Sequence, residues 1–136
     1  KLELAPLPEG VRARKRIVKL PSGAHFVPEA VRQEWGKNPD QLMGEVGLRP
    51  YSLPGGVRSR HGGQRSGLAV SKLSPRMRQA GLEEGMILIS LNGRPVTSKA
   101  KAVRTAKQLY KQGVRVFQAR VLHYGREQTL TYRVDD

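Results

Sequence analysis

Apolar positions along the chain predict four strands in its second half. Residues 86–91 are nearly all apolar, which indicates a strand buried on both faces. Residues 67–73 alternate loosely between apolar and polar side chains and predict another strand. Residues 114–122 and 127–134 predict the last two, and residues 123–126 form the hairpin between them.

Turn and capping residues separate these strands from the neighbouring elements. Asn92 and Gly93 follow the apolar run and form a strong turn signal. Ser74 and Pro75 suit the start of a short helix, because serine caps the first turn and proline fits its first position. Gly81 then ends that helix.

The clearest helical pattern covers residues 99–112. Thr97 or Ser98 can cap this helix, and Gly113 ends it. Its apolar side chains repeat with the helical period and form one stripe, made of Ala102, Val103, Ala106, Leu109 and Tyr110. The rest of the helix is rich in lysine and arginine, which predicts a solvated basic face.

The first third of the chain is less regular. Residues 1–15 are interpreted as a linker or the tail of a preceding domain, since proline and glycine interrupt regular structure there. Residues 16–44 predict a short strand and then a helical appendage that begins at Pro28. Asn38 and Pro39 are expected to split this appendage into two helices.

Two further features of the first half bear on packing. Trp35, the single tryptophan, is expected in the core or in a contact between the appendage and the domain. Residues 52–66 are rich in glycine and serine and predict a mobile loop between strands, with His61 as a solvent-exposed turn residue.

Together these elements predict an α+β fold. We expect a small antiparallel β-sheet or partial barrel packed by two helices, formed by residues 45–136 and preceded by the short helical appendage. The chain is long enough for one core with such an addition.

The charge of the chain indicates the chemistry of its partners more than the class of its fold. The chain carries 25 Lys and Arg against 11 Asp and Glu, a formal net charge of +14. Such a field favours acidic partners, whether nucleic acid, an anionic membrane surface or an acidic protein face. The basic residues are dispersed and no basic run carries interleaved aromatic side chains, so we expect no specific nucleic-acid binding.

The sequence contains no strong signal of a catalytic or metal-binding site. There is no cysteine, and the three histidines lack metal-ligand spacing, so no metal site or cofactor is expected. No Gly-x-Ser-x-Gly pattern occurs, and the glycines at residues 62–67 lack the lysine and the following helix of a phosphate-binding loop. Glu83 and Glu84 are neighbours in a turn, where solvation explains them better than acid–base catalysis. We expect a protein that is not an enzyme.

The run from Leu73-Ser74-Pro75 to Asn92-Gly93, with Gly81-Leu82 and Gly85 between, resembles bacterial PDZ domains. Met86 departs from that pattern, which usually has aspartate after the glycine. The upstream segments 27–42 and 46–51 are similar to the region before the PDZ domain of the type II secretion inner-membrane protein C. This resemblance covers about residues 16–134.

The resemblance implies a non-enzymatic protein-interaction module on the periplasmic face of the bacterial inner membrane. Its partners would be the outer-membrane secretin, other inner-membrane components or secreted proteins. A homo-oligomer is a further option. The membrane anchor would precede this segment, which begins at Lys1 and is interpreted as a fragment. The alternative is the regulatory peptide-binding PDZ domain of a periplasmic or membrane protease, and the upstream helices favour the secretion component.

PDZ architecture implies where a partner would bind. A peptide would add as a strand between an exposed sheet edge and a helix. Residues 45–51 would form that edge and residues 99–112 the other wall, with the partner-binding positions Val46, Gly47, Leu48, Tyr51, Val103, Lys107 and Tyr110. Pro50 lacks an N–H, which weakens capture of an ordinary C-terminal peptide and favours a folded protein or a non-terminal segment. Val46 and Leu48 could equally be core residues of the strand.

Overall fold

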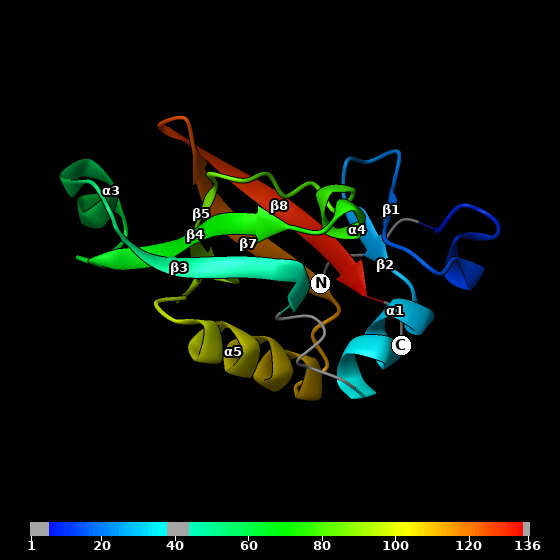
Figure 1. Cartoon of the computed structure of the whole chain (residues 1–136). Coiled ribbons are helices and arrows are strands. Elements are labelled where there is room, and N and C mark those ends of the chain that lie inside the picture. The colour runs from blue at the N-terminus through cyan, green and yellow to red at the C-terminus, as the bar shows by residue number, and fades with distance from the viewer. Residues whose placement is uncertain (1–5, 38–43, 135–136) are drawn as a thin grey trace.

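The computed structural model describes residues 6–37 and 44–134. Its elements in chain order are η1 (Val11–Ala13), β1 (Val18–Lys19), β2 (His25–Val27), α1 (Glu29–Lys37), β3 (Val46–Ser52), α3 (Gly55–Arg60), β4 (Ser66–Leu73), α4 (Pro75–Arg78), β5 (Ile87–Leu91), β6 (Arg94–Pro95), α5 (Lys99–Lys111), β7 (Val116–His123) and β8 (Arg126–Val134). Figure 1 shows the strands crossing the middle of the molecule, with α5 and α1 below them.

The strands form one sheet in the order β1-β2-β8-β7-β5-β4-β3, with β6 paired to β5. The expected α+β fold is confirmed, and the strand pairs from β3 to β8 are antiparallel, as predicted. The sheet as a whole is mixed, however, because β2 pairs with β8 in parallel. Phe26 and Val27 of β2 are buried, so this upstream strand contributes to the interior as well as to the sheet.

The turns follow the local sequence. The two residues between β7 and β8, Tyr124 and Gly125, have φ angles of 50° and 75°. Asn92 and Gly93, between β5 and β6, have φ angles of 48° and 78°. Two left-handed residues in succession are the requirement of a tight hairpin turn, which asparagine and glycine meet readily. Both predicted turns are therefore confirmed.

The helix caps also follow the prediction. The Ser98 hydroxyl accepts a hydrogen bond from the Lys101 amide at the start of α5. The Ser74 hydroxyl accepts one from the Met77 amide at the start of α4. Serine thus satisfies an amide that the first turn of a helix leaves unpaired.

Apolar side chains gather in three clusters. The largest packs β2 and α1 against β3, β4, α4 and β7 through Val27, Val31, Val46, Val70, Leu73, Met77 and Val121, among others. A second joins Leu53 and Val57 to Ile87, Ile89 and Leu122. A third joins Val11 and Leu20 to Phe26. Residues from the expected appendage therefore share the largest cluster with the main strands, whereas Val11 of the expected linker packs against Leu20 and Phe26.

Three predictions differ from the structure or fall outside it. Residues 52–66 contain the helix α3, because Val57 is buried against the second cluster and holds that segment in place. His61 is not a solvent-exposed turn residue, since only 20% of its side chain is exposed. The side chain of Trp35 and the break at Asn38 and Pro39 lie outside the part of the chain that the structure describes.

Candidate partner-binding groove

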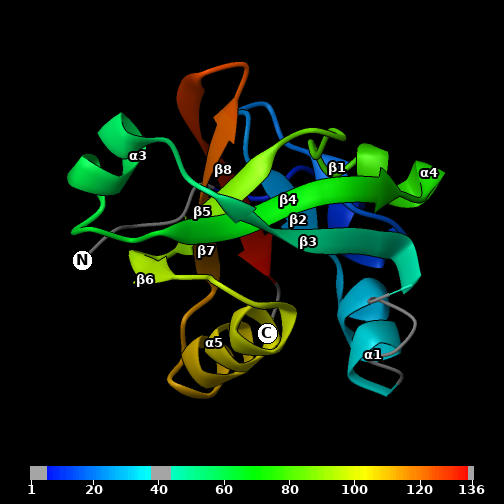
Figure 2. The same cartoon turned by 60° about the vertical axis from the view of Figure 1, so that its left-hand side comes forward.

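The strand β3 lies at one end of the sheet. It pairs with β4 alone in the described strand order, so its second side is an open edge. In both views the helix α5 lies below the strands, toward this end of the sheet (Figures 1 and 2). An open edge beside a helix is the arrangement that accepts an extended peptide as an added strand.

The hydrogen bonds of β4 show which backbone groups of β3 face the open edge. The Val70 amide donates to the Met86 carbonyl, and the Val70 carbonyl accepts from the Gly85 amide, so both groups of Val70 point away from β3. Leu48 lies opposite Val70 and belongs to a pair without mutual hydrogen bonds. Because the pattern alternates along the ladder, the N–H and C=O of Leu48 face outward.

The same alternation extends along the rest of β3. The Leu53 amide donates to the Arg65 carbonyl, which fixes the bonded pairs at odd-numbered residues of β3 after the bulge between Gly47 and Leu48. Pro50 and Ser52 therefore face outward with Leu48. Since proline has no N–H, the edge offers a donor at Leu48 and at Ser52 but only a carbonyl at Pro50.

The predicted positions on β3 have different roles. Val46 is 8% exposed and belongs to the largest apolar cluster, and Leu48 is half-buried against it, so their backbones rather than their side chains are available to a partner. Tyr51 is 48% exposed, which leaves its ring accessible.

Gly47 permits the close pairing of β3 with β4. A Cβ atom at this position would lie 2.8 Å from the Ser71 Oγ and 3.0 Å from the Lys72 Cβ. Separations this short force a neighbour to move. The glycine therefore lets β3 approach β4 closely at the bulge where the open edge begins.

The predicted positions on α5 do not form one equivalent row. Val103 is half-buried and Lys107 is exposed. The Tyr110 ring lies 3.9 Å from the Arg115 guanidinium and 5.4 Å from that of Arg32 in α1. These cation–π contacts tie Tyr110 to α1 and to the segment before β7, so its ring joins α5 to its neighbours.

An ion-pair cluster that the sequence does not reveal fixes the start of β3. Arg76 of α4 donates to both carboxylate oxygens of Glu45, at 2.8 and 2.6 Å, and to both of Glu34, at 3.0 and 3.2 Å. The hydrogen bonds that Arg76 donates to Glu45 and Glu34 raise the pKa of its guanidinium further above its usual range. The cluster links α1, α4 and the residue before β3, and no local pattern brings these three segments together.

The strand order, the open edge at β3 and the helix beside it decide the fold. The chain has a PDZ fold. In a PDZ fold a ligand adds to an open sheet edge beside a helix, which would make β3 and α5 the elements to test.

Comparisons with known proteins give only distant matches. No family model matches the chain, and no curated protein matches it. The structure is similar to the PDZ domain of EpsC from Vibrio cholerae, residues 204–305, with 20% identity, 77% of this chain and 92% of that chain covered, and a TM-score of 0.49. A shorter form of that domain, residues 219–305, is 18% identical, with 63% and 92% covered and a TM-score of 0.40.

Two further findings concern the described residues alone. Within residues 6–37 and 44–134, no three His, Cys, Asp or Glu side chains gather in a group that could hold a metal ion. None of the helices in these ranges is long and apolar enough to cross a membrane.

Proposed function

We propose that the chain is a non-enzymatic protein-interaction module that binds an extended segment of a partner protein along β3. The observation that carries this proposal is the pair of outward-facing amides, at Leu48 and Ser52, on an open edge that begins beside α5. Unpaired backbone groups in a regular array supply affinity for an added strand, and neighbouring side chains supply selectivity.

The charges of α5 indicate the chemistry of that partner. Lys101, Arg104, Lys107 and Lys111 are exposed along the helix, and its sequence contains no acidic residue. A segment that carries aspartate or glutamate would associate faster with this face at low salt. We therefore assign an acidic segment to the groove.

The missing donor at Pro50 favours a segment from the interior of a partner chain or an edge strand of a folded partner. A terminal peptide depends on a few backbone hydrogen bonds, and the loss of one weakens it measurably. A folded partner can compensate with contacts outside the groove, for instance at the exposed Tyr51.

We place this module in a type II secretion system, as the part of an inner-membrane component that connects the assembly to the outer-membrane secretin. Support comes from the sequence resemblance over about residues 16–134 and from the PDZ fold. Residues 45–136 form the PDZ unit in this proposal, and residues 16–44 add a strand and a helix to it. The periplasmic face of the inner membrane is the corresponding location.

Titration of the ¹⁵N-labelled chain with the purified periplasmic region of the secretin from the same organism tests the proposal. We expect the largest amide shifts at Leu48 and Ser52. Lys107→Glu should slow association at low salt, while Lys15→Glu, an equal charge change at another exposed lysine, should have a smaller effect. Binding that leaves the β3 amides unchanged would reject the groove, and no binding at all would reject the secretin as partner.

A further inference from the structure

The sheet has a second open edge, on β8. β7 pairs with β8 along residues 126–133, whereas β2 pairs with β8 only at Tyr132, Arg133 and Val134. Among the described strands, residues 126–131 therefore have a neighbour on one side only. Figure 1 shows β1 and β2 beside the C-terminal end of β8, which leaves the part near the hairpin uncovered by them.

Backbone groups of this part of β8 face the open side. The turn at Tyr124 and Gly125 makes His123 and Arg126 the closing, hydrogen-bonded pair of the hairpin. Alternation then turns the N–H and C=O of Glu127, Thr129 and Thr131 away from β7. The hydrogen bond from the Val134 amide to the Arg115 carbonyl, at 2.8 Å, agrees with this, because it places an even-numbered residue on the β7 side.

Two hollows meet at Thr129 on this edge. One, of about 490 Å³, lies between residues 22–25 and residues 129–131. The other, of about 470 Å³, extends from Thr129 across β7 and β5 to Arg60 and His61. Both have the size of small ligand sites. They share Thr129, so one hollow lies beside the open edge and the other extends from it over the face of the sheet.

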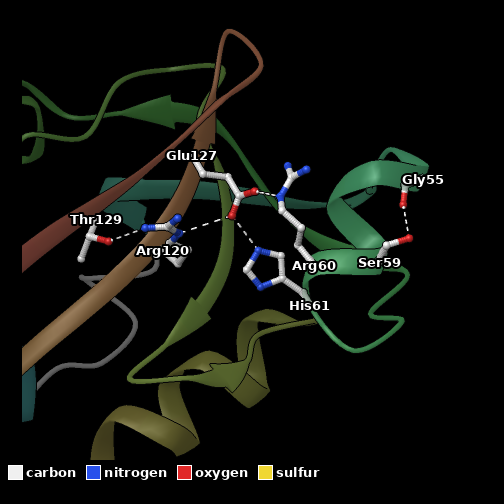
Figure 3. A network of polar contacts seen from close by, with 7 residues as sticks. All are labelled: Gly55, Ser59, Arg60, His61, Arg120, Glu127 and Thr129. Atoms are coloured by element: carbon white, nitrogen blue, oxygen red, sulfur yellow. Dashed lines mark hydrogen bonds and ion pairs between the residues drawn. The ribbon is translucent and has the colours of Figure 1, made fainter.

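The lining of the second hollow is basic. It contains Arg60, His61 and Arg120 and no carboxylate. Glu127, only 10% exposed, accepts hydrogen bonds from all three, as Figure 3 shows. One carboxylate thus orients two permanently charged guanidinium groups and leaves the site with a net positive charge.

Arg120 brings this positive charge to the open edge. Its Nη1 donates to the Thr129 Oγ1 at 2.9 Å, which holds the guanidinium over β8 (Figure 3). A strand added to β8 would lie about 4.8 Å away. An acidic side chain opposite Thr129 on that strand would therefore reach Arg120, and residues 126–131 would accommodate about 20 Å of extended chain.

We propose that residues 126–131 of β8 are a second strand-docking site, which binds an extended peptide segment with an acidic side chain opposite Thr129. The site is separate from the groove at β3, so one chain can hold two partner segments. Natural proteins blunt exposed edges with proline or bulges. Residues 126–131 contain no proline, and their register with β7 is uninterrupted.

The probe for this site is a six-residue peptide, Thr-Val-Thr-Glu-Thr-Val, blocked at both ends so that no terminal carboxylate competes. Its control has lysine in place of glutamate. Titrated into the ¹⁵N-labelled chain, the glutamate peptide should shift the amides of Thr129 and Thr131 and bind about three- to fivefold more tightly than the lysine peptide. Arg120→Gln should reduce that difference to less than about twofold.

A backbone variant separates edge pairing from charge attraction. Thr131→Pro removes an outward-facing donor but no hydrogen bond to β7 and no contact with Arg120, so the fold should survive and the peptide-induced shift at Thr129 should disappear. Pro50→Ala, on β3, should leave binding at β8 unchanged. Absence of shifts at Thr129 and Thr131, equal affinity for the two peptides, or slow amide exchange of both threonines in the free protein would overturn the proposal.

Discussion

The two open edges of the sheet differ in what they offer to a partner. β3 lies beside a basic helix but lacks one donor, because Pro50 faces outward. β8 has no helix beside its open part but keeps every outward-facing amide and has two hollows that meet at Thr129. If both edges bind as proposed, selectivity at β3 would come from the helix, whereas selectivity at β8 would come from the side chains around Glu127.

The strand β5 supports both edges, and its disruption should have the largest effect. Ile89 is fully buried in the cluster that joins α3 to β5 and β7. Ile89→Ala should lower the free energy of unfolding by about 2–5 kcal/mol, because it leaves a cavity in this cluster. Chemical denaturation measures the change, and a loss near zero would contradict the packing. Binding at β3 and at β8 should weaken together in this variant.

Gly47→Ala should weaken binding at β3 and leave binding at β8 unchanged. The added methyl group would displace Ser71 or Lys72 and shift the start of β3, at about 1–3 kcal/mol of stability. Binding at β3 should fall while peptide shifts at Thr129 and Thr131 persist. Gly125, in the hairpin, is unsuitable as the control because its φ is positive, so we choose exposed Gly55, whose Cβ would meet nothing within 4 Å. If Gly55→Ala lost as much stability and as much binding at β3, Gly47 would have no special role in the close pairing of β3 with β4.

Arg76→Ala tests whether the ion-pair cluster positions β3 without affecting β8. It removes the hydrogen bonds to Glu34 and Glu45, which should lower the free energy of unfolding by about 1–3 kcal/mol. Arg78→Ala, which removes a more exposed pair with Glu84, should change it by less than about 1 kcal/mol. The amide shifts that accompany Arg76→Ala should concentrate at β3 and α1. Shifts of the same size along β8 would contradict this separation.

The carboxylate at the β8 edge should show its effect in acid. The hydrogen bond from His61, together with those from Arg60 and Arg120, lowers the pKa of Glu127 to about 2. A lowered pKa means that the folded chain favours the ionised form, so this stabilisation is complete above the ordinary pKa of about 4.5 and is lost as the pH falls toward 2. Glu127→Gln should flatten the dependence of stability on pH in that range. An unchanged slope would contradict the network.

Local patterns predicted those parts of the fold that local forces determine. The caps at Ser74 and Ser98 and the two hairpin turns need only neighbouring residues, and the sequence identified each of them. The helix α3 was missed because a single apolar residue, Val57, anchors a segment whose composition favours a loop.

The candidate sites were less accessible to sequence reasoning. The open edge at β3 was anticipated through the PDZ resemblance, and the outward direction of Pro50 then followed from the strand register. The pairing of β2 with β8 brings together residues more than a hundred positions apart, and no local sequence pattern predicts this pairing. The basic cluster around Glu127 depends equally on tertiary contacts, since Arg60 and His61 come from the segment predicted as a loop.

The central claim is that β3 binds its partner through backbone groups along the open edge, and Pro50→Ala tests it most directly. The substitution restores one outward-facing N–H beside those of Leu48 and Ser52. Affinity for an acidic peptide blocked at both ends, measured by amide shifts at Leu48 and Ser52, should increase by about 2- to 12-fold, the equivalent of one hydrogen bond. Unchanged affinity in a variant that keeps the fold, with these amides unmoved, would show that partners do not extend β3.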